Sequence, residues 1–197
     1  RFPKHSLTRK LLRILKYPLA APSANISTKI SPVSKEDVKD EFGKKIKFVL
    51  DGGQSKIGLE STIVSLINKP QILRLGGTQT STINKILKNS LKFNKKNKKL
   101  TVPGQGKVHY SPEIPIRLNV NKPKQGEAFI LVKKRKLSSK NFYYLSKTNN
   151  LRQAAKNLYK TLRMIKKKKF KSLNPEKISN KGFGEAINDR LIRASKY

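Results

Sequence analysis

Apolar residues recur at helical spacing in several stretches of the chain, with polar residues between them. In the segment LTRKLLRIL this period ends before Pro18, which cannot continue a helix. Ser34-Lys35-Glu36-Asp37 forms a capping box, and Gly43 is a stop signal. We therefore predict helices over residues 7–15, 35–42, 83–91, 151–165 and 185–194.

Shorter apolar runs bounded by turn residues predict strands. The predicted strands cover residues 19–21, 47–50, 61–67, 71–75, 116–120, 128–132 and 142–145. A tight Asn68-Lys69-Pro70 connection joins the third of these to the fourth. Strands and helices alternate towards the carboxy terminus, which predicts a small α/β domain there.

A polar and proline-rich stretch interrupts this pattern in the middle of the chain. The run from Lys92 to Lys99 is basic, and Val102-Pro103-Gly104-Gln105-Gly106 does not suit regular structure. A connection of this length is typical of a linker or a functional loop. We place the linker at residues 93–118, between a first domain at 1–92 and a second at 119–197.

Composition narrows the class of protein. Hydrophobic residues make up only 36% of the chain but cluster into runs, which argues for a folded core. The absence of cysteine excludes disulfides and thiolate metal sites, and no run approaches the roughly 20 apolar residues of a membrane span. We expect a cytoplasmic protein with no membrane partner. The chain begins at Arg1 without a signal-peptide pattern, so we also expect that an amino-terminal part is absent.

The formal net charge of +35 indicates a polyanionic partner or a bias in composition. The densest runs, residues 95–99 and 166–169, hold lysine and asparagine with little arginine or aromatic content. Proteins that read nucleic acids use arginine and aromatic residues among their charges. The pattern therefore favours a solvated, biased surface over dedicated RNA binding, although both readings stay open.

Several kinds of active site are missing from the sequence. We find no Walker loop, no dinucleotide fingerprint, no hydrolase elbow and no metal-ligand spacing for His5 and His109. We therefore predict no protein metal site, and these motifs identify no catalytic residue. Small hydroxyl residues and an arginine remain, a combination suited to an anionic, adenylate-like ligand.

The order of short motifs resembles the threonylcarbamoyl-AMP synthase family, whose catalytic domain has the YrdC-like fold. The motifs are Arg1-Phe2-Pro3-x-His5, Ala21-Pro22-Ser23-Ala24-Asn25, Ser31-Pro32, Leu50-Asp51-Gly52-Gly53, Gly58-Leu59-Glu60-Ser61-Thr62, Leu73-Arg74-x-Gly76, Pro103-Gly104-Gln105 and His109-Tyr110-Ser111-Pro112. The segment from Gly182 to Leu191 is similar to the end of the extra domain in longer, two-domain members. The resemblance implies an α/β protein: the carboxy-terminal portion of a YrdC-like twisted mixed sheet with helices, followed by a small Rossmann-like α/β domain.

The resemblance also implies a nucleotidyltransferase reaction. L-threonine, bicarbonate or CO2, and ATP would yield threonylcarbamoyl-adenylate and pyrophosphate, with magnesium accompanying the triphosphate. A downstream transferase complex would then modify adenosine 37 of tRNAs that read ANN codons. Whether this chain binds tRNA directly is left open.

Site residues follow from the same motifs. Arg1, Ser61 and the backbone near Ala21 would hold L-threonine, and Ser23, Ser31 and Arg74 would contact ATP. Tyr110 would fold over the nucleotide as part of a lid that excludes water.

The family's amino-terminal Lys-Arg…Lys-Pro-Leu segment, which binds the ATP phosphates, does not occur in this chain. We therefore expect a fragment that is inactive or weak by itself. The alternative is a basic RNA-binding or nucleotide-binding regulatory module without turnover.

Overall fold

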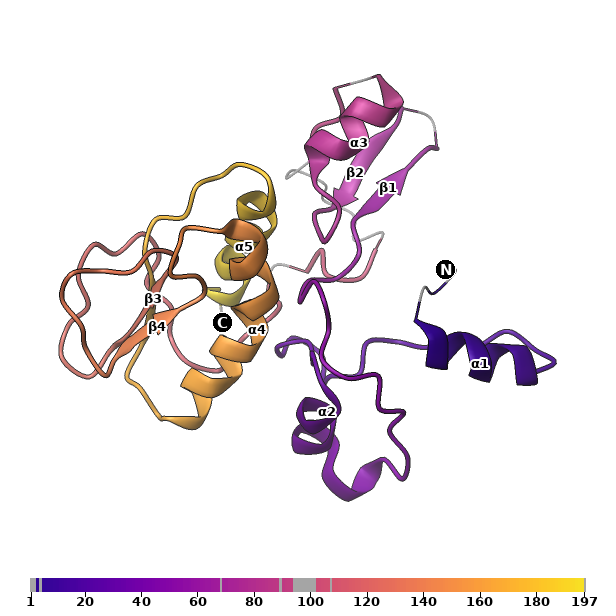
Figure 1. Cartoon of the computed structure of the whole chain (residues 1–197), viewed down its shortest axis with the longest axis horizontal. Helices are drawn as coiled ribbons and strands as arrows, with labels where there is room; N and C mark the ends of the chain where they lie inside the picture. Colours follow the sequence, from indigo (N-terminus) through magenta and orange to yellow (C-terminus); the bar gives the residue numbers. More distant parts are fainter. Residues whose placement is uncertain are drawn as a thin grey trace. The chain divides into compact units, whose positions relative to one another are not determined.

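The computed structural model describes residues 3, 5–67, 69–88, 90–93, 102–106 and 108–196 (Figure 1). The chain divides into two compact units. The first unit comprises Arg1–Ile26 and Ser31–Lys56, and the second comprises Ser27–Ile30 and Ile57–Tyr197. The elements, in order, are α1 (Ser6–Ile14), α2 (Lys35–Phe42), the 3-10 turn η1 (Gly43–Lys45), β1 (Ile63–Ser65), β2 (Gln71–Arg74), α3 (Thr80–Leu87), β3 (Ala128–Leu131), β4 (Phe142–Tyr144), α4 (Leu151–Lys167), β5 (Leu173–Pro175) and α5 (Phe183–Ala194).

The two helices of the first unit confirm the predictions from periodicity and capping. The N-cap of α1 is His5, whose side chain accepts a hydrogen bond from the Thr8 amide. The N-cap of α2 is Ser34, whose hydroxyl accepts from the Asp37 amide at 3.3 Å. Gly43 ends α2 with a φ of 53°, a conformation that glycine adopts without penalty.

Two predicted strands of the first unit are wrong. Neither residues 19–21 nor residues 47–50 form a strand. A strand requires a hydrogen-bonded neighbour as well as an apolar run, and neither segment pairs with a described residue in a ladder. Phe48, in the middle of the second segment, is 91% exposed. Hydropathy alone therefore overstated the sheet content of this unit.

A short antiparallel pair, β1 with β2, confirms the predicted hairpin in the second unit. Its ladder covers residues 63–65 and 71–74, less than predicted, and its register shifts between Ile63 and Val64, where Leu73 of β2 is left without a partner in the ladder. Residues 61 and 62 therefore lie just outside the ladder. Behind the pair, a small core is formed by Ile72, Leu75, Leu91 and Ala186. Since Ala186 belongs to α5, the carboxy-terminal helix packs in the same core as the hairpin.

The rest of the second unit contains a three-stranded parallel sheet in the order β4-β3-β5. All four residues of β3 are buried, as expected for the central strand of a covered sheet. Helix α4 contacts both β4 and α5 (Figure 1). It buries the predicted apolar face, which includes Ala154, Ala155, Leu158, Leu162 and Ile165. The structure is thus a mixed α/β protein with small sheets.

Two strand assignments in this sheet differ from the sequence analysis. Residues 116–120 do not form the predicted strand, although Ile116 makes an isolated bridge with Leu173 and the amides of Arg117 and Val120 donate to the carbonyl oxygens of Leu173 and Pro175. The third strand is instead β5, which is three residues long and ends in Pro175, and therefore lacks a recognisable strand pattern. The Rossmann-like comparison and the boundaries at 92/93 and 118/119 stay predictions. No helix in the described ranges is long and apolar enough to cross a membrane.

Candidate functional site

The predicted site residues divide between the two units. Ala21, Ser23 and Ser31 belong to the first unit, where Ala21 and Ser23 are exposed on an irregular segment and Ser31 is buried. Arg1 lies outside the described residues. The other three predicted residues, Ser61, Arg74 and Tyr110, belong to the second unit, and the structure brings them together.

Arg74 binds Ser61 through several hydrogen bonds. Its Nε and Nη2 atoms donate to the Ser61 carbonyl oxygen at 3.1 and 2.9 Å, and Nη2 also lies 3.2 Å from the Ser61 hydroxyl. Because Ser61 precedes the first ladder pair, Ile63 with Arg74, its carbonyl oxygen can accept from a side chain. Arg74 is only 6% exposed, so this fork-shaped contact is made in a dry environment.

The predicted linker also reaches Arg74. The Arg74 Nη1 atom donates to the Pro103 carbonyl oxygen at 3.0 Å, and the side-chain Nε2 of Gln105 donates to the Leu73 carbonyl oxygen at 3.1 Å. Between them, Gly104 has a φ of 85°, and a Cβ there would lie 2.5 Å from the Tyr110 hydroxyl. Glycine is therefore required at 104 for this close approach.

Tyr110 is the most enclosed of the predicted residues, with 1% exposure and a φ of 64°. Its ring stacks on Tyr159 at a centroid distance of 5.7 Å and lies 4.1 Å from the His109 ring. The buried hydroxyl has no hydrogen-bond partner among the described residues. Burial raises the pKa of Tyr110 to about 12, so its hydroxyl stays protonated at neutral pH.

His109 is partly buried, and three arginine side chains lower its pKa together with burial. Burial, assisted by the positive charges of Arg190, Arg193 and Arg74, lowers the pKa of His109 despite the opposing charge of Glu60. Its Nδ1 atom is buried without a hydrogen-bond partner among the described residues. His109 therefore contributes a neutral imidazole to this cluster at pH 7.

Arg190 of α5 is a residue of the cluster to which the sequence analysis gave no role. Its guanidinium is fully buried and lies over the Tyr110 ring, 4.8 Å from the centroid. It donates to Glu60 Oε2 from Nε and Nη2 at 3.2 and 3.1 Å, to the Leu75 carbonyl at 2.6 Å and to Asp189 at 2.8 Å. A signal was present in the sequence: Arg190 stands at helical spacing within the apolar face of α5, where a charge requires partners.

Glu60 and Tyr159 complete the cluster. The Tyr159 hydroxyl donates to the Glu60 carboxylate, at 3.0 Å from Oε1 and 2.9 Å from Oε2. Burial raises the pKa of the Tyr159 hydroxyl well above its usual value, and it remains a donor. Glu60 was quoted in a motif, but nothing in its position along the chain indicated a partner 130 residues away.

The arrangement can bind an anion beside neutral hydroxyl groups. Ser61 is exposed, and Arg74 places a guanidinium next to its hydroxyl. Within the described part of the chain, no group of three or more His, Cys, Asp or Glu side chains is placed to hold a metal ion. A guanidinium beside a hydroxyl group can orient an anionic ligand and neutralise part of its charge.

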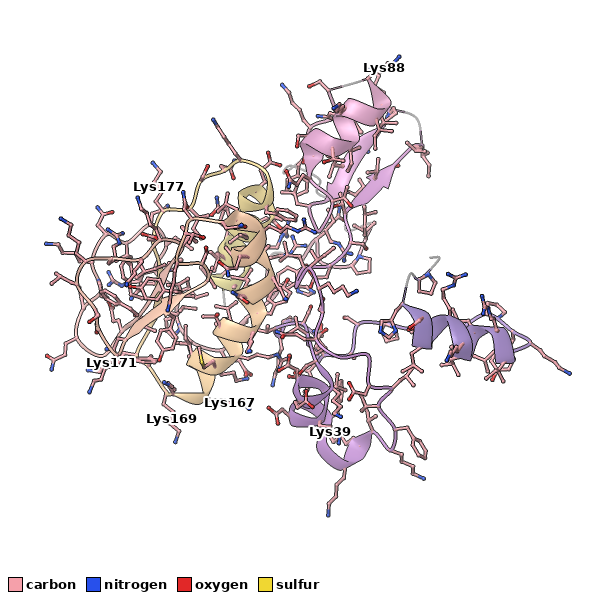
Figure 2. All side chains as sticks on the ribbon, in the orientation of Figure 1. Lys39, Lys88, Lys167, Lys169, Lys171 and Lys177 are labelled. Atoms are coloured by element: carbon pink, nitrogen blue, oxygen red, sulfur yellow. The ribbon has the colours of Figure 1, made fainter. Side chains whose placement is uncertain are left out.

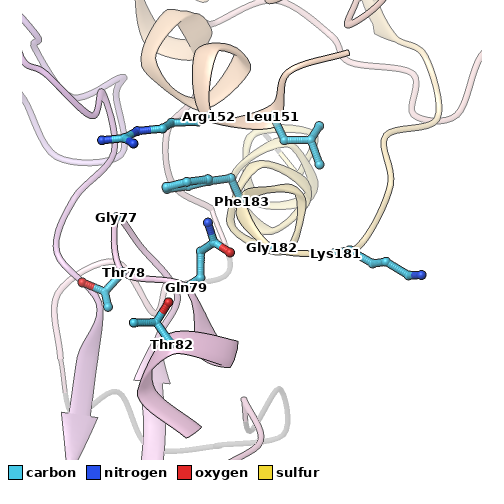
Figure 3. A pocket seen from close by; sticks show the side chains of 9 residues that line it. All are labelled: Gly77, Thr78, Gln79, Thr82, Leu151, Arg152, Lys181, Gly182 and Phe183. Carbon is cyan, nitrogen blue, oxygen red and sulfur yellow. The ribbon is translucent and has the colours of Figure 1, made fainter. Parts of the chain in front are cut away.

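A separate pocket of about 570 Å³ lies where the amino-terminal ends of α3, α4 and α5 meet (Figure 3). Arg152 and Lys181 are the charged residues among its lining. None of the predicted site residues lines it. The pocket therefore does not belong to the cluster around Arg74 and Tyr110.

Exposed lysines are spread over both units. Figure 2 shows Lys167, Lys169 and Lys171 at and just beyond the end of α4, and all three are exposed. Among the aromatic residues nearby, Tyr143 lies under the ammonium of Lys168 at 5.5 Å. A charged surface of this kind suits a solvated face as well as a polyanion, and both readings stay predictions.

Two family models cover the chain between them. One described as "Telomere recombination" matches residues 1–76, and one described as "Threonylcarbamoyl-AMP synthase, C-terminal domain" matches residues 69–196. Threonylcarbamoyl-AMP synthase of Pyrococcus abyssi aligns with 100% of this chain at 30% identity. The enzyme of the same name from Bacillus subtilis aligns with 99% of the chain, also at 30% identity. The chain spans 63% and 62% of the lengths of these two relatives.

Solved structures agree with these matches. The crystal structure of P. abyssi Sua5 complexed with L-threonine superposes on all of this chain with a TM-score of 0.85, at 30% identity and over 63% of the solved chain. A second structure, of P. abyssi Sua5 with an adjacent histidine and tyrosine both replaced by alanine, has a TM-score of 0.80 at 29% identity. Since the second family model matches well over half of the residues, and the motifs and the fold agree with it, the chain belongs to the threonylcarbamoyl-AMP synthase family.

Proposed function

We propose that the protein carrying this chain condenses L-threonine, bicarbonate or CO2, and ATP into threonylcarbamoyl-adenylate and pyrophosphate. The observation that carries the proposal is the direct contact of Arg74 with Ser61 and with the segment leading to Tyr110. Three separate motifs of the family supply these residues. Their meeting in one cluster is what a shared substrate site requires.

L-threonine is the substrate with support from a relative, since P. abyssi Sua5 has been crystallised with it. In this chain, the Ser61 hydroxyl accepts a hydrogen bond from Arg74, which leaves its own proton available for a ligand. We propose that Ser61 donates this proton to threonine, together with Arg1 and the backbone near Ala21. Threonine would then bind beside a fixed positive charge.

For ATP, we propose contacts with Ser23, Ser31 and Arg74. The guanidinium of Arg74 is bound to carbonyl oxygens of Ser61 and Pro103, so a phosphate group would compete with the Pro103 carbonyl for Nη1. A charged phosphate oxygen is the stronger acceptor. Nucleotide binding would therefore displace the segment at Pro103 from Arg74, and Tyr110 would move with this segment as the lid.

The chemical step would use no covalent nucleophile. A carbamate oxygen, formed from threonine and CO2, would attack the α-phosphorus of ATP, and the bond to the β-phosphate oxygen would break to release pyrophosphate. The protein would align the reactants and neutralise charge. Magnesium would enter with ATP as part of the substrate complex.

The product would be consumed by a transferase complex that modifies adenosine 37 of tRNAs reading ANN codons, in the cytoplasm. In P. abyssi Sua5, an adjacent histidine and tyrosine have been replaced by alanine. His109-Tyr110 is the one His-Tyr pair in the sequence of this chain, which supports a role for this pair. We assign this pair to the lid. The parallel sheet β4-β3-β5 would form the Rossmann-like domain that follows the lid.

The test supplies the complete protein that carries this chain with L-threonine, bicarbonate and magnesium ATP. Release of pyrophosphate that depends on threonine, with threonylcarbamoyl-adenylate identified by mass, is the expected result. Tight RNA binding with a steep salt dependence and no threonine-dependent turnover would support the RNA-binding alternative instead. Nucleotide binding without either product would support a regulatory module.

A further inference from the structure

One side chain of α5 contacts three segments that each carry a predicted site residue. Arg190 binds Glu60, which precedes Ser61, and the carbonyl oxygen of Leu75, which follows Arg74. It also lies over the ring of Tyr110 itself. Arg190 is thus the point at which the three segments are joined in the second unit.

The environment of Arg190 suits a guanidinium in particular. The side chain is 0% exposed, and the carboxylates of Glu60 and Asp189 balance its charge. Its planar fork donates in several directions while its face rests on an aromatic ring. A lysine ammonium at this position would keep the charge and lose the fork and the flat contact.

The same helix holds a second part of the predicted lid. We call residues 102–106 and 108–111 the linker arm. One turn after Arg190, the Nη1 atom of Arg193 donates to the carbonyl oxygens of Gln105 and Gly106 at 2.8 and 2.7 Å. Asp189 connects the two arginines, since it accepts from Nη1 of Arg190 and from Nε of Arg193. Helix α5 therefore contacts the linker arm at two points: Arg193 binds its backbone, and Arg190 packs on the Tyr110 ring.

We propose that Arg190 is a positioning residue that sets the place of Tyr110, and with it the linker arm, relative to Ser61 and Arg74. This inference rests on the proposed function, because it assigns the control of that site to a helix outside the predicted catalytic domain. A 1 Å error in such placement can reduce a rate by about 100-fold. The role predicts coupling between Arg190 and Tyr110 rather than independent effects.

A double-mutant cycle tests this coupling. The variants are Arg190→Lys, Tyr110→Leu and their combination, and Arg152→Lys is the matched control at an exposed arginine with no ion-pair partner among the described residues. We expect each single variant of the cycle to lower kcat/KM for ATP about 10- to 100-fold. The double variant should have a kcat/KM no lower than that of the less active single variant. Arg152→Lys should keep the activity. Losses that multiply in the double variant would overturn the proposal.

A spectroscopic measurement reports the position of the linker arm without using activity. These 197 residues contain no tryptophan, so Val108→Trp in this chain places a single reporter two residues from Tyr110. Adding Arg190→Lys should shift its emission to the red and increase its quenching by acrylamide, whereas adding Arg152→Lys should change neither. An unchanged reporter in Arg190→Lys, with circular dichroism showing the fold intact, would contradict the inference.

Three further outcomes are distinguishable. If Arg190→Lys fails to fold, Glu60→Gln decides, because it removes the charge that holds the guanidinium and preserves the shape at 60; a reporter shift supports the proposal and no shift overturns it. If the unmodified protein makes no threonylcarbamoyl-adenylate, the proposed function fails, and the reporter alone decides whether Arg190 holds the arm. If the protein is active but reporter and cycle show no coupling, the function stands and this inference fails.

Discussion

Arg74 holds the Ser61 carbonyl oxygen between its Nε and Nη2 atoms, at 3.1 and 2.9 Å. A lysine cannot reproduce this fork, because it carries one ammonium group on a flexible stem. We expect Arg74→Lys to destabilise the protein by about 1–3 kcal/mol and to raise KM for ATP more than KM for threonine. Urea unfolding and initial rates of pyrophosphate release measure the two effects. An unchanged KM for ATP in this variant would show that Arg74 does not bind the nucleotide.

Ser61→Ala removes one hydroxyl from an exposed position and leaves the backbone contact with Arg74 in place. Loss of one hydrogen bond of about 1.4 kcal/mol to the ligand corresponds to a roughly tenfold weaker binding. We therefore expect KM for L-threonine to rise about tenfold while KM for ATP stays the same. Initial rates at varied threonine concentration provide the measurement. An unchanged KM for threonine would show that Ser61 does not bind the amino acid.

Tyr110→Phe tests the cost of an unpartnered hydroxyl. The Tyr110 hydroxyl is buried without a hydrogen-bond partner among the described residues, so its removal should stabilise the ligand-free protein by about 1 kcal/mol. Tyr159→Phe is the matched control, since the Tyr159 hydroxyl donates to Glu60 and its loss should destabilise. Thermal unfolding without ligand compares the two. A lower Tm for Tyr110→Phe would show that its hydroxyl is hydrogen-bonded in solution.

Glu127 should make stability sensitive to acid. Burial alone would raise its pKa, but hydrogen bonds from the Lys124 amide, Arg117 and Ser172 lower the pKa to about 2. Because the unfolded chain takes up the proton near pH 4.5, the stabilisation from Glu127 is complete above that pH and is lost as the pH falls towards 2. Urea unfolding between pH 7 and pH 2.5 should therefore show a smaller pH dependence for Glu127→Gln. Identical pH profiles would contradict the assignment.

Gly58→Ala should weaken the contact between the Gly58–Thr62 motif and α4. Gly58 has a φ of 76°, and an added Cβ would lie 2.4 Å from the Lys156 carbonyl oxygen. Backbone strain and overpacking together should destabilise by roughly 2–4 kcal/mol. Gly53→Ala separates the two causes, because Gly53 has a similar φ of 69° and open space around it. Equal losses in the two variants, measured by thermal unfolding, would exclude the steric contribution.

Helices could be predicted from the sequence because their signals are local, as could the hairpin whose strands are close in the chain. The period of α4 and the capping box of α2 each lie within one stretch of the chain. The strands depended on partners elsewhere, so residues 47–50 remained unpaired and the proline-containing β5 was not recognised. The apolar period of a helix depends only on residues close in the chain, whereas a strand forms only where folding supplies a hydrogen-bonded partner from another segment.

For the candidate site, the sequence by itself determined the family, through the order of its short motifs, and predicted which residues would bind a ligand. Only the tertiary structure decided which of them meet: Ser61, Arg74 and Tyr110 in one unit, with Arg190 against the Tyr110 ring. The physical reason lies in the burial of a charge. A guanidinium removed from water needs several acceptors. Arg190 has one in its chain neighbour Asp189, and only folding brings Glu60 and the Leu75 carbonyl oxygen within reach.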